Sequence, residues 1–148
     1  MINHIWSVLC RTSVIDGDTN ALSIQDVLEE LNIKAQLSPT VDLENTKELV
    51  FPVSFEITSM LGRDDDSIDE HASVKIVQYS PKNEILNENS NDFIIPKGMK
   101  RMRMRMKNGS MKVTVSGRYK FKVELTQENK KTTVATLPLE VFLDLQEA

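Results

Sequence analysis

Two short acidic segments could hold a divalent cation, and the first lies near the N-terminus. Asp16, Asp18 and Asn20 repeat the first three ligand positions of a calcium-binding EF-hand loop, in which oxygen atoms at every second residue surround the ion. The rest of the loop does not fit, because Ala21 stands where glycine is needed and Val27 where a bidentate glutamate is needed. We therefore interpret residues 16–20 as a hairpin turn, for which Asp, Gly and Asn are typical.

The second acidic segment is the run Asp64, Asp65 and Asp66, which Asp69 and Glu70 follow. Carboxylates in a loop at the end of a β-sandwich can bind calcium, but a run of like charges usually forms a solvated loop. We favour the solvated loop and predict no metal and no cofactor. The sequence alone leaves calcium binding at this loop open.

Nucleophilic catalysis and zinc binding have little support in the sequence. The chain has one cysteine, Cys10, and two histidines, His4 and His71, which are too few for a Cys/His zinc site. Cys10 lies in an apolar segment, where burial raises the pKa of a thiol and keeps it unreactive. No G-x-S-x-G, H-E-x-x-H or phosphate-binding glycine motif is present. We predict that the protein is not an enzyme.

Basic residues are concentrated in one segment of the chain. Residues 97–122 hold ten Lys and Arg and no Asp or Glu, whereas the other residues include eight basic and 22 acidic ones, for a net charge of −4. A surface that gathers these cations can bind phosphate groups or an acidic protein. No aromatic side chain alternates with the cations to stack against bases, which disfavours binding of nucleic acid. The alternative is that the cations form a solvated face of a sheet, whose charge discourages pairing of its edge with strands of other chains. The candidate partner-binding residues are Arg101, Arg103, Arg105, Lys107 and Lys112.

Residues 100–107 alternate between basic residues and methionine, which is the period of a β-strand. Asn108-Gly109 follows and is the preferred centre of a two-residue type I′ turn. We therefore predict a hairpin in which Met106 pairs with Met111 and Met104 with Val113. The methionines on the predicted core face are Met102, Met104 and Met106. The next cations, Arg118, Lys120 and Lys122, are expected on the opposite outer face of the molecule.

The remaining sequence predicts further strands and little helix. Short segments with period-two alternation or β-branched residues are separated by turn residues. We expect an all-β, antiparallel β-sandwich of eight or nine strands, built as one domain over residues 1–148. One helical turn is expected at residues 43–47, and Trp6 is expected in the core or between the sheets. The other strands are expected at residues 5–15, 21–28, 33–37, 49–60, 72–79, 84–87 and 137–145.

Residues 111–123 carry a resemblance to a known architecture. The run M-K-V-T-V-S-G-R-Y-K-F-K-V resembles the corner between the two sheets of immunoglobulin-like sandwiches, where a tyrosine two residues after glycine turns its hydroxyl onto the corner backbone. The structural residues that this implies are Gly117, Tyr119 and Phe121. Together with the first strand and P-L-x-V at residues 138–141, the chain is similar to small bacterial β-sandwich proteins of a domain family of unknown function. That similarity implies no active-site residue.

Composition limits the cellular compartment in which the protein is expected and the class of function that it can have. A single cysteine excludes an internal disulfide and favours a reducing, cytoplasmic compartment, and no apolar run reaches the roughly 18 residues of a membrane span. We expect a non-catalytic intracellular binding or assembly module that docks an acidic partner on residues 101–107. One alternative is a homo-oligomeric structural subunit of a phage-like or envelope-associated assembly. Another is a hydrolase or metal-dependent enzyme with its site in the loops.

Overall fold

The structure is a computed structural model that describes residues 1–37 and 48–147, and it confirms the all-β expectation. All regular elements in these residues are strands, and there are eleven of them in place of the eight or nine expected. One added strand arises because residues 52–54 divide the predicted strand 49–60 in two. The helical turn expected at residues 43–47 lies outside the described residues. The strands are β1 (Asn3–Ile15), β2 (Leu22–Val27), β3 (Glu30–Leu37), β4 (Leu49–Phe51), β5 (Phe55–Gly62), β6 (Glu70–Tyr79), β7 (Ile85–Ile95), β8 (Arg101–Asn108), β9 (Met111–Val113), β10 (Gly117–Gln127) and β11 (Lys130–Glu147).

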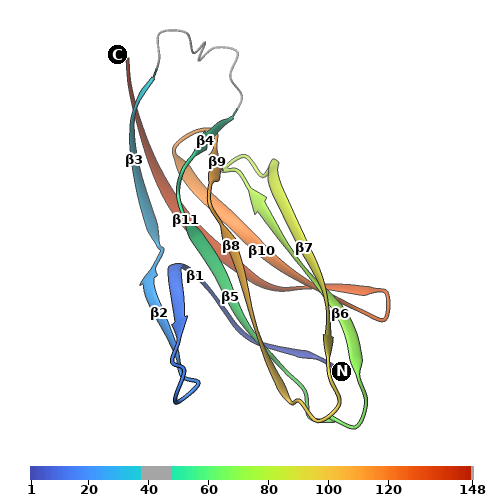
Figure 1. The fold of residues 1–148 in the computed structure, drawn as a ribbon. Helices are drawn as coiled ribbons and strands as arrows, with labels where there is room; N and C mark the ends of the chain where they lie inside the picture. Colours follow the sequence, from blue (N-terminus) through green and yellow to red (C-terminus); the bar gives the residue numbers. More distant parts are fainter. Residues whose placement is uncertain (38–47, 148) are drawn as a thin grey trace.

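The described strands form two main sheets and one short ribbon (Figure 1). The first sheet has the order β2-β1-β5-β8, the second has the order β3-β11-β10-β6-β7, and β4 pairs with β9. Neighbouring strands run antiparallel, except that β3 and β11 run parallel. The expectation of a wholly antiparallel sandwich is therefore wrong at this edge. A parallel pair needs a long connection between its strands, and here most of the chain lies between them.

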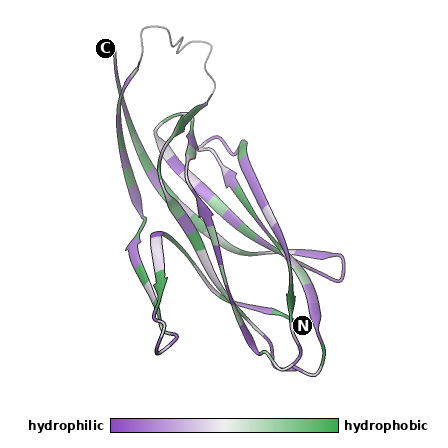
Figure 2. Ribbon diagram, in the orientation of Figure 1, coloured by the Kyte–Doolittle hydropathy of each residue, from purple (hydrophilic) through white to green (hydrophobic). Residues whose placement is uncertain are grey.

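The two sheets pack face to face because alternate residues of their strands are apolar (Figure 2). The rings of Phe55 on β5 and Phe121 on β10 bridge the sheets, with their centroids 5.5 Å apart. Met106 is buried in the same cluster, and Met102 and Met104 pack against it while remaining half-buried. The core positions predicted for Phe121 and for the methionine face of residues 102–106 are confirmed.

Strands β8 and β9 do not form the predicted hairpin. β8 pairs with β5, where Met106 lies opposite Ile57, and β9 pairs with β4, where Met111 lies opposite Phe51. A type I′ turn needs positive φ angles at both central residues, and residues 108 and 109 have none. The chain instead passes through this segment from β8 into β9. Residues 109–110, which separate β8 from β9, lie opposite residues 52–54, which separate β5 from β4. Both strands are therefore interrupted at the same level.

The corner between β9 and β10 has the tyrosine contact that the sequence resemblance implied. The Tyr119 hydroxyl donates to the backbone oxygen of Val115 at 2.6 Å and accepts from the amides of Thr114 and Val115 at 2.9 and 3.1 Å. Gly117 has a φ of +147°, and a Cβ atom at this position would lie 2.9 Å from Pro81. A larger residue at this corner would therefore be strained, which explains the glycine.

Strand β1 changes its neighbours along its length. As far as Cys10 it pairs with β5, and beyond that residue it pairs only with β2. The hairpin of β1 and β2 bends against the outer face of the sheet, where Ser13 contacts Glu56. Trp6 is half-buried and lies outside the core cluster, in contrast to the expectation. It lies opposite Met60 on the outer face, because inward and outward residues alternate along the strand.

Candidate binding surface on strand β8

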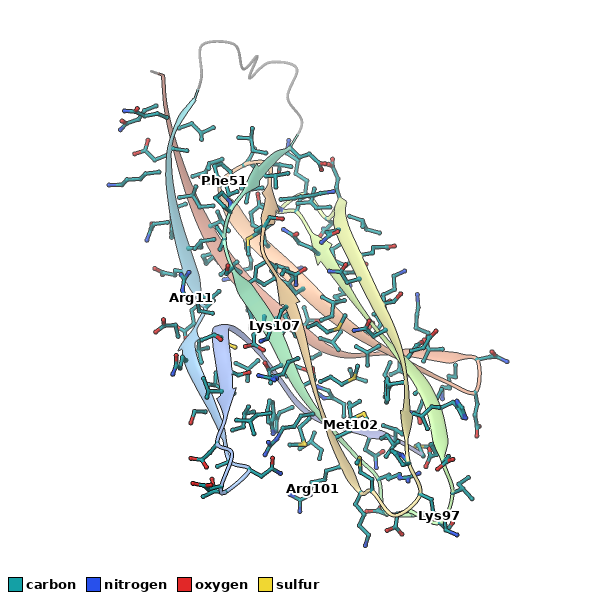
Figure 3. All side chains as sticks on the ribbon, in the orientation of Figure 1. Arg11, Phe51, Lys97, Arg101, Met102 and Lys107 are labelled. Atoms are coloured by element: carbon teal, nitrogen blue, oxygen red, sulfur yellow. The ribbon has the colours of Figure 1, made fainter. Side chains whose placement is uncertain are left out.

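Strand β8 is the terminal strand of its sheet, and its outer face carries a row of cations. Its eight residues pair with β5 without a register shift, from Arg101 opposite Gly62 to Asn108 opposite Phe55. The regular alternation therefore places every second residue on the outer face. Figure 3 shows Arg101 and Lys107 towards opposite ends of the strand. We name this set the cationic row, which spans about 20 Å and consists of Arg101, Arg103, Arg105 and Lys107.

The cationic row contacts neutral oxygen atoms. Arg103 donates to the backbone oxygen of Asn20 at 2.8 Å, and Arg105 donates to the backbone oxygen of Ser13 at 3.4 Å. Among the described residues, no carboxylate forms an ion pair with any member of the row. Successive cations on one face stand about 7 Å apart, within a Debye length of about 8 Å at physiological salt, so their potentials add.

Other cations of the basic segment are placed differently. Lys112, which was expected on the same surface, lies on β9 and pairs with Glu48 at 3.6 Å. It does not extend the row, because β9 belongs to the ribbon with β4 and not to the β5–β8 sheet. On the other main sheet, Arg118 pairs with Glu140 at 2.6 Å, and the ammonium of Lys122 lies 4.9 Å from the ring centroid of Tyr79. The predicted division of the cations between two sheets is confirmed.

A groove of about 460 Å³ lies at the Arg101 end of the row, between β8 and the tip of the β1–β2 hairpin. It joins apolar side chains to two cations, and this combination suits a ligand that carries a carboxylate beside an apolar group. The sequence did not indicate this groove, because Asn20 lies 83 positions before Arg103. The residues that line it are Ile15, Asn20, Met60, Met99, Arg101, Met102 and Arg103.

Glu56 is a buried carboxylate beside the row that sequence reasoning missed. Only 1% of its surface is exposed, because the β1–β2 hairpin covers it. Its Oε2 accepts from Ser13 at 3.0 Å and from Thr58 at 2.9 Å, and its Oε1 has no hydrogen-bond partner among the described residues. Burial, reinforced by the Glu56 charge, raises the pKa of the neighbouring Cys10 thiol. A protonated, covered thiol is a poor nucleophile.

The two acidic segments form turns that use their own carboxylates. Asp16 Oδ1 accepts from the amides of Thr19 and Asp18 at 2.9 and 2.8 Å, and these bonds lower the pKa of Asp16. Asp65 Oδ1 accepts from the amide of Ser67 at 2.9 Å, and bonds from Ser67 lower the pKa of Asp65. Of the other weak metal candidates, Asp64 is exposed, and Asp66 accepts an amide through its backbone oxygen. Within residues 1–37 and 48–147, no three His, Cys, Asp or Glu side chains are grouped to hold a metal ion.

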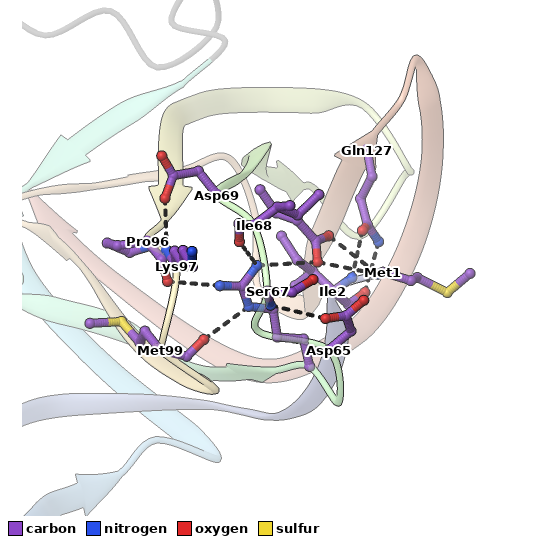
Figure 4. Close-up of polar contacts among 12 residues, drawn as sticks. Met1, Ile2, Asp65, Ser67, Ile68, Asp69, Pro96, Lys97, Met99 and Gln127 are labelled. Carbon is purple, nitrogen blue, oxygen red and sulfur yellow. Dashed lines mark hydrogen bonds and ion pairs between the residues drawn. The ribbon is translucent and has the colours of Figure 1, made fainter.

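A buried arginine, Arg63, joins the loops at the Arg101 end of β8, and the three residues whose backbone accepts its hydrogen bonds, Ile68, Pro96 and Met99, are labelled in Figure 4. The Arg63 guanidinium is fully buried and donates to the backbone oxygens of Met99, Ile68 and Pro96 at 2.9, 2.7 and 2.7 Å. It also pairs with Glu70 at 3.3 Å, and Glu70 in turn pairs with the N-terminal ammonium at 3.3 Å. These contacts position the segment that enters β8.

Comparison with known proteins adds no family assignment. No protein-family model matches the chain, and no characterised protein is detectably similar to it in sequence. The resemblance to a bacterial β-sandwich family and the immunoglobulin-like topology therefore stay predictions. The described residues include no helix that is long and apolar enough to cross a membrane. The function must be argued from the surface itself.

Proposed function

We propose that the protein is a non-catalytic, intracellular binding module that docks an acidic protein segment on the cationic row. The observation that supports the proposal is the row itself, in which four like charges lie without a carboxylate partner among the described residues. Arg103 and Arg105 donate to neutral carbonyls, and a carboxylate is a stronger acceptor for a guanidinium than a carbonyl is. An acidic partner therefore gains charge-assisted bonds and relieves the repulsion within the row.

An acidic protein suits the surface better than a nucleic acid does. Bases are usually held on exposed aromatic rings, and the outward residues of β8 are all cations. The adjoining groove is partly apolar, which suits amino-acid side chains better than phosphates.

The test is a charge reversal, R101E/R103E/R105E, read by the fluorescence anisotropy of a labelled acidic peptide rich in glutamate. Exposed ion pairs contribute about 0.2–1 kcal/mol each. Losing three attractions and adding three repulsions of this size costs about 1.2–6 kcal/mol together, so the reversal is expected to weaken binding by at least about tenfold. Binding of the unaltered protein is expected to weaken between about 0.05 and 0.5 M salt, because added ions screen these charges.

The matched control is R118E/K120E/K122E, which changes the net charge equally on the other main sheet. We expect this variant to keep most of the peptide affinity. Equal losses in both variants would show that net charge, and not the row, controls binding. A labelled single-stranded oligonucleotide that binds more tightly than the peptide would contradict the choice of a protein partner.

A further inference from the structure

We infer that the partner binds by adding a β-strand to the free edge of β8, and that its sequence alternates acidic and apolar residues. This inference rests on the proposed function and specifies its mode of binding. Three features of β8 support it: an unpaired edge, the cationic row on one face and half-buried methionines on the other.

The edge of β8 is open and regular. No described strand pairs with the side of β8 that faces away from β5. Terminal strands are commonly protected from pairing by proline, by a bulge or by charge, and β8 has no proline and no register shift. Its protection is charge alone. That charge repels a second copy of β8 and other basic strands, but it attracts an acidic one.

The free edge has a defined length. At one end of β8, the side chain of Asn89 on β7 donates to Asn108 at 2.9 Å, which brings the two strands together there. Between Arg101 and Lys107, no hydrogen bond among the described residues joins β8 to β7. The stretch of β8 that has no backbone partner on this side is therefore about seven residues long, or roughly 23 Å at the usual rise per residue.

The two faces of β8 determine the sequence pattern of the added strand. Side chains of a paired strand alternate between the same two faces and stand about 5 Å from their neighbours. Every second side chain would lie beside the cationic row, where a carboxylate can accept from a guanidinium. The intervening side chains would lie beside Met102 and Met104, which pack against the core but remain half-buried. Methionine adapts readily to apolar neighbours of different shapes, so these positions suit valine, leucine or isoleucine.

Backbone bonds and side chains would then have separate roles. The exposed N–H and C=O groups of β8 supply affinity to any extended segment, whereas the alternating acidic and apolar contacts select the sequence. An acidic segment without the alternation can use the cationic row but cannot satisfy both faces.

The experiment compares labelled peptides of one composition in binding to the full chain at low salt. The first is the heptapeptide Glu-Val-Glu-Val-Glu-Val-Glu, and the second has its valines grouped at one end. Two further versions of the first are N-methylated on alternate residues, one on each edge of the extended peptide. We expect the alternating peptide to bind at least about tenfold more tightly than the grouped peptide, because only it contacts both faces. Only one of the two methylated versions should lose binding, because a strand pairs through one edge.

A second measurement follows the β8 backbone directly. The amides of β8 that do not bond to β5 should exchange slowly with solvent only when the alternating peptide is bound. As a control, R101E/R103E/R105E should weaken the binding of both acidic peptides. Sedimentation of the chain alone would detect self-association. Equal affinities of the alternating and grouped peptides, both lost on charge reversal, would overturn strand addition and leave the proposed function standing. If neither peptide binds even at low salt, the proposed function itself is wrong. A stable dimer that is lost on charge reversal would assign the edge to a second copy of the chain and also overturn this inference.

Discussion

The buried Arg63 makes a quantitative prediction about the loops that lead into β8. Its guanidinium donates three short bonds to the backbone oxygens of Met99, Ile68 and Pro96 and one longer bond to Glu70. The substitution R63M keeps most of the volume but removes all four donors. Each partly buried carbonyl that loses its partner costs about 1 kcal/mol or slightly more, while Glu70 keeps the N-terminal ammonium. The expected loss in the free energy of unfolding is therefore about 3–5 kcal/mol.

Thermal and urea unfolding, followed by circular dichroism, measure this loss. For a chain of this size each kcal/mol lowers the melting temperature by about 2–4 °C, so R63M is expected to melt about 6–20 °C below the unaltered protein. R63K should recover only part of the difference, because one ammonium cannot reproduce the planar fork. The control is R118M, which removes an exposed ion pair and should cost less than about 1 kcal/mol. A melting temperature of R63M within about 3 °C of the unaltered protein would refute this account of the loops.

Two further predictions concern buried groups outside the cationic row. Y119F removes the hydroxyl that donates a hydrogen bond to Val115 and accepts hydrogen bonds from the amides of Thr114 and Val115. It should lower the free energy of unfolding, measured by urea titration, by about 2–3 kcal/mol. A loss under about 0.5 kcal/mol would contradict the role given to that hydroxyl. Burial raises the pKa of Cys10, so the folded state keeps the thiol proton to higher pH than the unfolded chain does. This difference has no effect below the ordinary thiol pKa of about 8.5, and it makes stability fall as the pH rises above that value. C10A should flatten this fall, and Cys10 should react with a disulfide reagent far more slowly in the native protein than in urea; an equal slope or an equal labelling rate would contradict its burial.

Local pattern was sufficient for much of the candidate surface. The alternation of residues 100–107 predicted both faces of β8, because successive side chains of any strand point to opposite sides. The resemblance to the corner of immunoglobulin-like sandwiches implied the positions of Gly117 and Tyr119, and the contact of the tyrosine hydroxyl lies within five residues. These features depend only on neighbours in sequence, so the residue pattern contains the information needed to predict them.

Pairing partners were less predictable than strand faces. Asn108-Gly109 favours a type I′ turn, but the structure pairs β8 with β5 and β9 with β4 instead. The observed path lets Met111 and Val113 reach the core opposite Phe51 and Leu49, with both of them buried. A local turn preference is small beside the burial of two apolar side chains, each worth about 1.5–3 kcal/mol. For the same reason, the prediction that Lys112 shares a sheet with the arginines of β8 was wrong.

The sequence by itself determined that this protein is all-β, that its positive charge is concentrated in residues 97–122, and that the arginines and methionines of β8 point to opposite faces. Only the tertiary structure decided that β8 ends its sheet with an open edge, that the β1–β2 hairpin lies beside the cationic row, and that Glu56 is buried beneath this hairpin. The physical reason is the range of the interactions. Side-chain alternation is set by adjacent residues, whereas edges, grooves and burial depend on which distant strands meet, and that is decided by the packing of the whole core.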